Sequence, residues 1–286
     1  MQTRVIAAPL DGGQKRVSRL GLGCSQLGSF GNSTPLADLR ALLRRALDQG
    51  VNLFDTADIY GQGDSEREIG RAVAGRRSEV FVITKFGKLF SPTARLMRPF
   101  KPILKPLLRM GGAGEAVAAQ REGVMREDFR PERLAVALDA SLGRLKSDHV
   151  DAVLLHSPPI SVITDPAVAA ALESIRASGK ARHVGVSVET AAELEAAAML
   201  RVATILQIPL DLAPRLLEGA AARRLADGDL FVFAREILRL QPGVPARDAL
   251  RRALTQGHLS GLIVGTNRAD HLDDLVEVAR EKIDLG

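Results

Sequence analysis

The sequence predicts an α/β protein whose parallel strands close into a (β/α)8 TIM barrel, with an N-terminal β-hairpin and a long insert after strand 3. Short runs rich in Val, Ile and Leu alternate with amphipathic helical stretches, and eight such pairs follow an N-terminal piece. The 286 residues suit one barrel, so we expect a single domain over residues 1–286. The expected strands lie near residues 20–23, 53–56, 80–85, 150–156, 183–187, 204–208, 230–234 and 262–265.

The expected helices begin at recognisable capping signals and carry apolar stripes on one face. A doubly wound sheet would instead need a glycine-rich phosphate turn directly after its first strand. Gly21-Leu22-Gly23 lacks the third glycine and has no helix directly behind it, so we reject that fold. The helix start signals are Thr34-Pro35, the possible capping boxes at 65–68 and 190–193, and Asp165-Pro166.

Two segments stand outside the strand–helix alternation. Residues 4–8 and 17–20 flank Asp11-Gly12-Gly13, which predicts a hairpin able to plug the N-terminal end of the barrel. Between Lys85 and Pro131 lie about 45 residues, a length typical of functional or mobile connections. From residue 88 to 121 this insert is basic and interrupted by prolines and glycines. We expect a mobile lid over the mouth whose charge favours an anionic substrate.

Composition narrows the function. The chain has one cysteine, Cys24, so an intramolecular disulfide is impossible. It has no tryptophan, one tyrosine and a net charge of only +5, which argues against a nucleic-acid partner. We see no run long enough for a membrane span and expect a cytoplasmic enzyme without a metal. The sequence leaves the oligomeric state open.

Four polar residues follow three consecutive strands. Asp55 ends the second strand, Tyr60 lies in the loop after it, Lys85 ends the third strand and His156 ends the fourth. Strand C-termini meet at one mouth of a parallel barrel. Taken singly, each residue has a common structural role, such as a cap, an exposed lysine or a core histidine. Together they can deliver a proton to a carbonyl oxygen, with Lys85 lowering the phenol pKa and Asp55 keeping Lys85 protonated. Replacing Asp55 should therefore act in the same direction as replacing Lys85.

The segment from Asp55 to Gly61, with Ser65-Glu66 and Ile69-Gly70 behind it, resembles the signature of the aldo-keto reductase family. Ile83-Thr84-Lys85 and Leu154-Leu155-His156 resemble further family motifs. The resemblance covers nearly the whole chain. It implies a catalytic tetrad of Asp55, Tyr60, Lys85 and His156, with Tyr60 as the general acid. It also implies a nicotinamide cofactor bound in an extended form.

The same resemblance implies a set of cofactor contacts. Ser187 matches a family serine, but Val188 replaces the amide that usually follows it. Arg235 stands where many members have a stacking tyrosine and other branches have an arginine; the alternative is a surface ion pair. The strand-to-helix passage near residue 265 suits a 2′-phosphate because free helix N–H groups bind anions. The implied cofactor residues are Gly23, Cys24, Ser187, Gln207, Arg235, Gly265, Thr266, Asn267, Arg268, His271 and Asp274.

The preferred function is reduction of an aldehyde or ketone by NADPH, with NADH possible. One alternative is an NAD-dependent sugar or alcohol dehydrogenase of the same family, which the stretch from Tyr60 to Glu66 and the long insert also resemble. A second is a non-catalytic cofactor-sensing scaffold, and a third is a phosphate-binding barrel lyase. The four-residue set argues against both of these. We expect a small carbonyl compound as partner, of a kind the sequence does not name.

Overall fold

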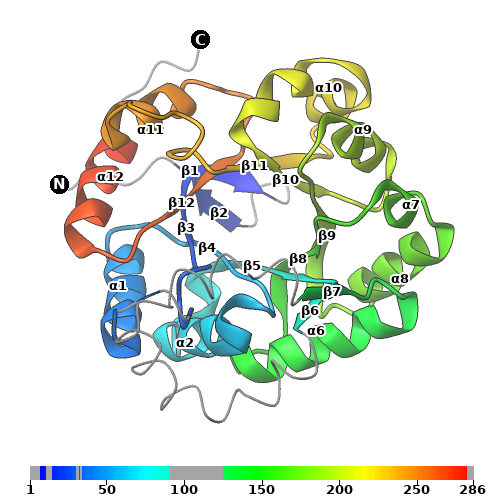
Figure 1. Cartoon of the computed structure of the whole chain (residues 1–286), viewed down its shortest axis with the longest axis horizontal. Coiled ribbons are helices and arrows are strands. Elements are labelled where there is room, and N and C mark those ends of the chain that lie inside the picture. Colours follow the sequence, from blue (N-terminus) through cyan, green and yellow to red (C-terminus); the bar gives the residue numbers. More distant parts are fainter. Residues whose placement is uncertain (1–6, 11–14, 30–31, 33, 91–124, 282–286) are drawn as a thin grey trace.

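The structure is a closed eight-stranded parallel barrel surrounded by helices, which confirms the predicted fold (Figure 1). It is a computed structural model that describes residues 7–10, 15–29, 32, 34–90 and 125–281. Neighbouring barrel strands follow one another along the chain, and the last strand pairs with the first. The strands are β3 (Leu20–Gly23), β4 (Leu53–Asp55), β5 (Phe81–Phe86), β8 (Val150–His156), β9 (Ala181–Ser187), β10 (Ile205–Pro209), β11 (Phe231–Arg235) and β12 (Gly261–Gly265). Each expected strand is present, with its ends within two residues of the prediction.

The helices form the outer layer and bury their apolar faces against the strands. Asp165 caps α8 through its side chain, and Thr190 forms the expected capping box with Glu193. The described helices are α1 (Leu36–Asp48), α2 (Asp64–Ala72), α6 (Pro131–Leu145), α7 (Ile160–Ile163), α8 (Pro166–Ala177), α9 (Ala191–Met199), α10 (Gly219–Ala226), α11 (Ala246–Leu254) and α12 (Ala269–Arg280), with 3-10 turns η2 (Tyr60–Gly63), η3 (Arg77–Glu79) and η6 (Leu210–Leu217).

Two predicted caps are wrong. Helix α1 begins one residue later than expected, with Pro35 at the N-cap and no side-chain cap. Helix α2 begins at Asp64 behind Gly63, so Ser65 lies inside its first turn and does not cap it. The hydroxyl of Ser65 instead contacts Thr56 Oγ1 at 2.7 Å and donates to the carbonyl of Cys24 at 3.0 Å. Tertiary partners thus replaced the local capping that the sequence pattern favoured.

The predicted hairpin is present as β1 (Ala7–Leu10) paired antiparallel with β2 (Lys15–Ser18). The first strand extends to Leu10, two residues beyond the expected end, and residues 1–6 and 11–14 lie outside the described part. Val17 of β2 is buried in the cluster that fills the barrel interior, together with Leu53 and Phe81. The hairpin lies across one end of the barrel in Figure 1, as a plug would.

Most of the long insert, residues 91–124, lies outside the described residues, so the lid prediction stays untested. Its two roots form a short antiparallel ribbon of β6 (Lys88–Phe90) and β7 (Met125–Glu127). None of the helices in the described ranges is both long and apolar enough to cross a membrane.

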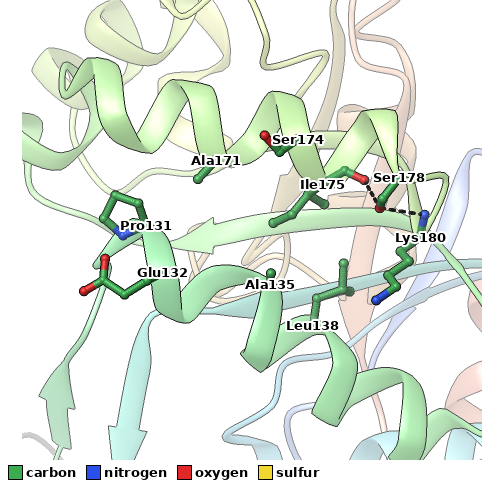
Figure 2. A pocket seen from close by; sticks show the side chains of 9 residues that line it. All are labelled: Pro131, Glu132, Ala135, Leu138, Ala171, Ser174, Ile175, Ser178 and Lys180. Carbon is green, nitrogen blue, oxygen red and sulfur yellow. Dashed lines mark hydrogen bonds between the residues drawn. The ribbon is translucent and has the colours of Figure 1, made fainter.

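Helices α6 and α8 enclose a shallow cavity of about 310 Å³ on the flank of the barrel. Figure 2 shows Glu132 and Lys180 at its opposite ends, with Leu138 and Ile175 between them. The hydroxyl of Ser178 donates to the Ile175 carbonyl at 2.6 Å, which closes the C-terminal end of α8. None of the four proposed catalytic residues lines this cavity.

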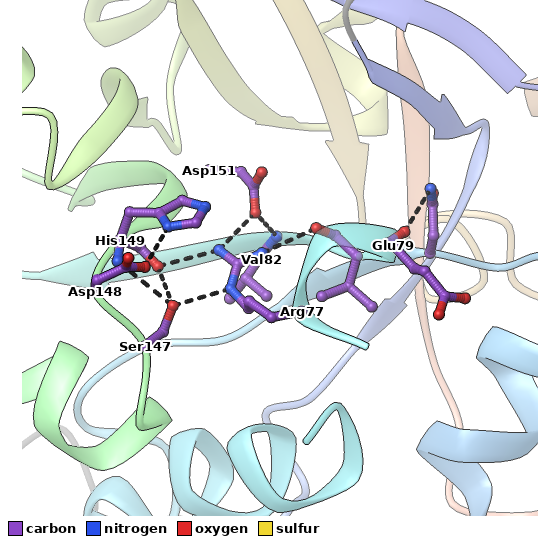
Figure 3. Close-up of polar contacts among 9 residues, drawn as sticks. Arg77, Glu79, Val82, Ser147, Asp148, His149 and Asp151 are labelled. Atoms are coloured by element: carbon purple, nitrogen blue, oxygen red, sulfur yellow. Dashed lines mark hydrogen bonds and ion pairs between the residues drawn. The ribbon is translucent and has the colours of Figure 1, made fainter. Parts of the chain in front are cut away.

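An ion pair joins neighbouring elements at the N-terminal ends of β5 and β8. Asp151 is fully buried and accepts from Arg77 at 2.8 Å and from the backbone N–H of Val82 at 2.9 Å. Arg77 also donates to Ser147 Oγ and to the His149 carbonyl, both at 3.1 Å (Figure 3). The carboxylate therefore fixes strand β5 and turn η3 at the base of the barrel.

Asp151→Ala is expected to lower the free energy of unfolding by about 3 kcal/mol, since it leaves the buried N–H of Val82 without its acceptor and the largely buried Arg77 guanidinium without its counter-charge. The Arg77 side chain is 21% exposed, so water can solvate part of its charge. We therefore expect a loss at the lower end of the range that is usual for breaking a buried ion pair. Asp139→Ala is the control, because its pair with Lys180 is about half exposed on both sides and should contribute at most about 1 kcal/mol. Urea unfolding measures both. Equal losses in the two variants would contradict the assignment.

Candidate active site

Strand periodicity directs the expected site residues into the barrel mouth. Side chains alternate between the two faces of a strand. Phe81 and Ile83 pack in the interior cluster, so Lys85 at the end of β5 points the same way. On β4, Leu53 packs in the same interior cluster, so Asp55, two residues later, also points inward. The same alternation also directs His156, Ser187, Gln207 and Arg235 inward at the C-terminal ends of β8 to β11.

Lys85 and Asp55 form a buried ion pair at the centre of this mouth. Lys85 Nζ donates to Asp55 Oδ1 at 2.6 Å and to the carbonyl of Thr56 at 3.0 Å. The two side chains are 1% and 7% exposed. Burial alone would lower the pKa of Lys85, but the charges of Asp55 and Tyr60 outweigh it and raise that pKa. Lys85 therefore remains a cation inside the protein.

Tyr60 and His156 complete the group. Lys85 Nζ lies 5.2 Å from the centre of the Tyr60 ring, and the rings of Tyr60 and His156 meet edge-on at 5.7 Å. Burial raises the pKa of Tyr60, while the charge of Lys85 opposes that rise. Burial and then the charge of Lys85 hold the pKa of His156 well below its usual range, so the imidazole is neutral. His156 Nδ1 is buried and has no hydrogen-bond partner among the described residues.

A chain of hydrogen bonds extends the pair across the barrel. Gln207 Nε2 donates to Asp55 Oδ1 at 2.8 Å, and Ser187 Oγ donates to Gln207 Oε1 at 3.1 Å. Both Gln207 and Ser187 are almost fully buried. The family resemblance implied that Gln207 contacts the cofactor. It did not indicate that Gln207 also binds Asp55. The signal that was available is the strand alternation, which directs both side chains to the interior.

The loop that carries Tyr60 is fixed from behind by α2. Glu66 is fully buried and accepts from Thr84 Oγ1 at 2.7 Å and from Arg144 Nε at 2.5 Å. Gly61 has a φ of 58°, and a Cβ there would lie 2.5 Å from the carbonyl oxygen of Leu27. At Gly70, a Cβ would lie 2.3 Å from a backbone oxygen of α6. Glu66, Gly61 and Gly70, which belong to the family signature, therefore hold α2 and the loop of Tyr60 against their neighbours.

Arg235 lies at the mouth in an ion-pair cluster. It pairs with Glu189 and with Glu236, each at 2.6 Å, and donates to the Val188 carbonyl at 2.8 Å. Its side chain is only 15% exposed. Ser157 Oγ donates to Glu189 at 2.7 Å, which connects this cluster to the end of β8 beside His156. The sequence analysis did not identify Glu189 or Glu236 as partners of Arg235.

The passage from β12 into α12 is exposed, as a phosphate site should be. Arg268 binds the carboxylate of Asp270 through Nε at 3.0 Å and through Nη2, and this pair holds the pKa of Asp270 at about 2. Asn267 Nδ2 donates to Asn32 Oδ1 at 3.3 Å. Gly265 and His271 are exposed, and Thr266 Oγ1 donates to the Arg268 carbonyl at 3.3 Å.

Among the other expected cofactor residues, Cys24 and Gly23 are less open, whereas Asp274 is exposed. Cys24 is completely buried, burial raises the pKa of its thiol, and the thiol donates to the Leu22 carbonyl at 3.4 Å. A cofactor contact through this side chain would require movement. Gly23 packs close to Ile263, and Asp274 lies 3.6 Å from Arg247 on the flank of α12. Among the described residues, no group of three or more His, Cys, Asp or Glu side chains could hold a metal ion.

The model of the aldo/keto reductase family matches residues 19–215, which run from the first barrel strand past the fifth and sixth. The chain belongs to this family. It is 30% identical over 174 residues to 6-dehydroglucose reductase of Agrobacterium fabrum, covering 60% of this chain and 50% of the relative. It is 29% identical over 203 residues to an NADP(+) aldo-keto reductase of Schizosaccharomyces pombe, covering 68% of this chain and 50% of that protein. The chain thus spans about half the length of the curated relatives it matches.

Solved aldo-keto reductases share the fold over nearly the whole chain. A holo-form enzyme from Bacillus halodurans has a TM-score of 0.70 at 19% identity, covering 98% of this chain and 92% of its own. An enzyme from Klebsiella pneumoniae in complex with NADPH has a TM-score of 0.63 at 20% identity, covering 98% and 91%. At these low sequence identities, the similarity shows the barrel fold and the order of its elements alone.

Proposed function

We propose that this aldo/keto reductase uses a nicotinamide cofactor to reduce an aldehyde or ketone to an alcohol. One observation carries the proposal: the buried ion pair of Lys85 and Asp55 lies against the ring of Tyr60, and Tyr60 in turn meets a neutral His156. A buried phenol, a fixed cation and an imidazole with one unpartnered nitrogen are the parts that protonation of a carbonyl oxygen requires.

In this proposal each residue has one task. Tyr60 donates a proton to the carbonyl oxygen as that oxygen gains negative charge. Lys85 opposes the effect of burial on the phenol, and Asp55 keeps Lys85 charged. The neutral imidazole of His156 orients the carbonyl oxygen by a hydrogen bond. Gln207 holds Asp55 in place from the opposite wall.

The residues present fit a dinucleotide. The exposed N-terminal end of α12 offers free backbone N–H groups and Arg268 for a phosphate, and Gly265 leaves the approach open, since a Cβ there would meet nothing within 4 Å. When bound, the nicotinamide would supply the hydride. Ser187, Gln207 and Arg235 border the part of the mouth where its ring would lie next to Tyr60.

The test is cofactor-resolved kinetics on a panel of aldehydes, ketones and sugars, followed by loss of cofactor absorbance. We expect aldehyde reduction that depends on Tyr60. Faster oxidation of sugars or alcohols with NAD+ would favour the dehydrogenase alternative. Cofactor binding without any turnover would favour the sensing scaffold.

We further propose that NADPH is preferred over NADH, to an extent limited by Asp270. The guanidinium of Arg268 must release the Asp270 carboxylate before it can hold a 2′-phosphate. Asp270→Asn is therefore expected to tighten NADPH binding up to about fivefold, the equivalent of an exposed ion pair. Arg268→Ala should weaken NADPH binding about tenfold or more.

Fluorescence titration with both cofactors measures these effects, and NADH is the internal control because it lacks the phosphate. Its affinity should be nearly the same in all three proteins. Tighter binding of NADH than of NADPH by the wild type would contradict the preference.

A further inference from the structure

A second cavity, of about 460 Å³, lies beside the loop that carries Tyr60. Its volume is within the range of small-molecule sites. Asp58, Ile59 and Gln62 of that loop form one wall, the outer face of α6 forms another, and Lys88 and Leu89 of β6 close a third side. We call this cavity the loop groove.

The loop groove is cationic. Within the described ranges, no hydrogen bond or ion pair holds the side chain of Lys88, although its charge helps to lower the pKa of Glu189. Among the described residues, Arg133 reaches one carboxylate, that of Asp128, at 3.6 Å, and it is 48% exposed. Arg144 binds Glu66 through Nε and Ser141 through Nη2, which turns the rest of its guanidinium toward the groove. Of the residues that the structure describes, three cations and one carboxyl group, that of Asp58, thus line this space.

The surroundings of that carboxyl group favour its neutral form. Asp58 Oδ1 is buried and has no hydrogen-bond partner in the described structure. Burial first, and then the charge of Glu66, raise the pKa of Asp58 to about 8, although Arg144 and Lys85 oppose this. At neutral pH the group is therefore mostly protonated and can donate to an oxyanion.

None of the four proposed catalytic residues lines the loop groove, but the groove shares with them the loop that carries Tyr60. Asp58 and Ile59 directly precede Tyr60, and the backbone N–H of Asp58 donates to the Lys85 carbonyl at 3.1 Å. The positive charge of Lys88 is among the causes that lower the pKa of His156. An anion held by Lys88 is thus within electrostatic reach of the residues proposed to act on the carbonyl.

We propose that the loop groove binds the anionic end of the substrate, so that the preferred substrates are carbonyl compounds carrying a carboxylate or phosphate group. Lys88 and Arg133 supply the charge, and the protonated carboxyl of Asp58 donates a hydrogen bond to one of the oxygens. This inference rests on the proposed carbonyl reduction, which it narrows to a substrate class.

The experiment compares two aldehydes of nearly equal shape, 4-carboxybenzaldehyde and 4-carbamoylbenzaldehyde, in the holoenzyme. We expect the wild type to show a higher kcat/KM for the carboxylate. In the double variant Lys88→Ala/Arg133→Ala this ratio should fall about tenfold or more, while turnover of the neutral amide stays close to that of the wild type. Arg176→Ala is the matched control, because it removes a cation from α8, which takes no part in lining the loop groove.

A ratio near one in the wild type would overturn the proposal, as would an equal loss on both aldehydes in the double variant. Calorimetry separates this outcome from failure of the proposed reaction. The alcohols 4-(hydroxymethyl)benzoate and 4-(hydroxymethyl)benzamide are titrated into the wild-type complex with NADPH, where no reaction can occur. Tighter binding of the benzoate that is lost in the double variant would support the loop groove even if neither aldehyde were reduced.

The pH dependence of the ratio gives a further readout. Above about pH 8 Asp58 ionises and should repel the substrate anion, so the preference for the carboxylate falls as pH rises through that value. The other charged groups around it are Lys85, Lys88, Arg133, Arg144 and Glu66. Titration of Tyr60 affects both aldehydes alike and cancels in the ratio. Asp58→Asn should remove the fall, and a fall that persists would refute the role given to Asp58.

Discussion

Tyr60→Phe is expected to lower carbonyl-reducing turnover by about 10²–10⁴-fold, the usual contribution of a general acid. The substitution removes one oxygen and keeps the ring, so the edge contact with His156 and the packing against the Lys85 ammonium persist. Cofactor affinity, measured by fluorescence titration, should therefore change little. The chain has no other tyrosine that could take over the proton transfer.

His156→Gln tests whether His156 orients the carbonyl or donates the proton. If His156 only orients the carbonyl, this variant should raise KM and keep part of the turnover, since a glutamine amide can still donate. Turnover of Tyr60→Phe within a few-fold of wild type, with His156→Gln inactive, would assign the proton to the imidazole and refute the mechanism.

Lys85→Met is the second substitution with a large expected effect. It should lower turnover by about 10²-fold or more, because the phenol loses the cation that opposes the rise in its pKa caused by burial. Reduction needs the protonated phenol, so activity falls as pH rises through the Tyr60 pKa. Without Lys85 that pKa is higher, and the basic limb of the pH–rate profile should move upward. A profile with an unmoved basic limb would leave Lys85 with a structural role only.

Asp55→Asn is expected to act differently from what the sequence suggested. Asp55 raises the pKa of Lys85, so its loss makes the lysine proton easier to remove. Its negative charge also raises the pKa of Tyr60 directly. While Lys85 stays protonated, Asp55→Asn should therefore shift the basic limb downward, opposite to Lys85→Met. Gln207 loses a charged acceptor in the same variant, so a modest loss of stability should accompany the shift.

Much of the fold could be predicted from local sequence patterns. Strands covered on both faces have to be apolar throughout, and this made the eight barrel strands readable as short runs of Val, Ile and Leu. The strand alternation then placed Asp55, Lys85 and His156 at one mouth, since parallel strands end at the same edge. The start of α8 at Asp165 and the capping box of α9 were equally local.

The capping prediction for Ser65 failed because its side chain has a stronger partner far along the chain. Ser65 fits a capping box by sequence, yet its hydroxyl meets Thr56 and the Cys24 carbonyl, 41 residues away. Arg268 stays a candidate for the phosphate, and the structure adds that its guanidinium pairs with the carboxylate of Asp270, two residues away. No spacing rule specifies which of several possible acceptors a flexible side chain will reach.

The sequence by itself determined the barrel, the order of its strands and the four residues gathered at its mouth, because those follow from two-residue and 3.6-residue periods that act over short distances. Only the tertiary structure decided what surrounds those residues: the contact of Gln207 with Asp55, the carboxylates that hold Arg235, and the loop groove beside Tyr60. These depend on side chains from strands and helices up to 152 residues apart in the chain. Their contacts and charges are set by how closely the closed barrel brings them together and by how much water it excludes.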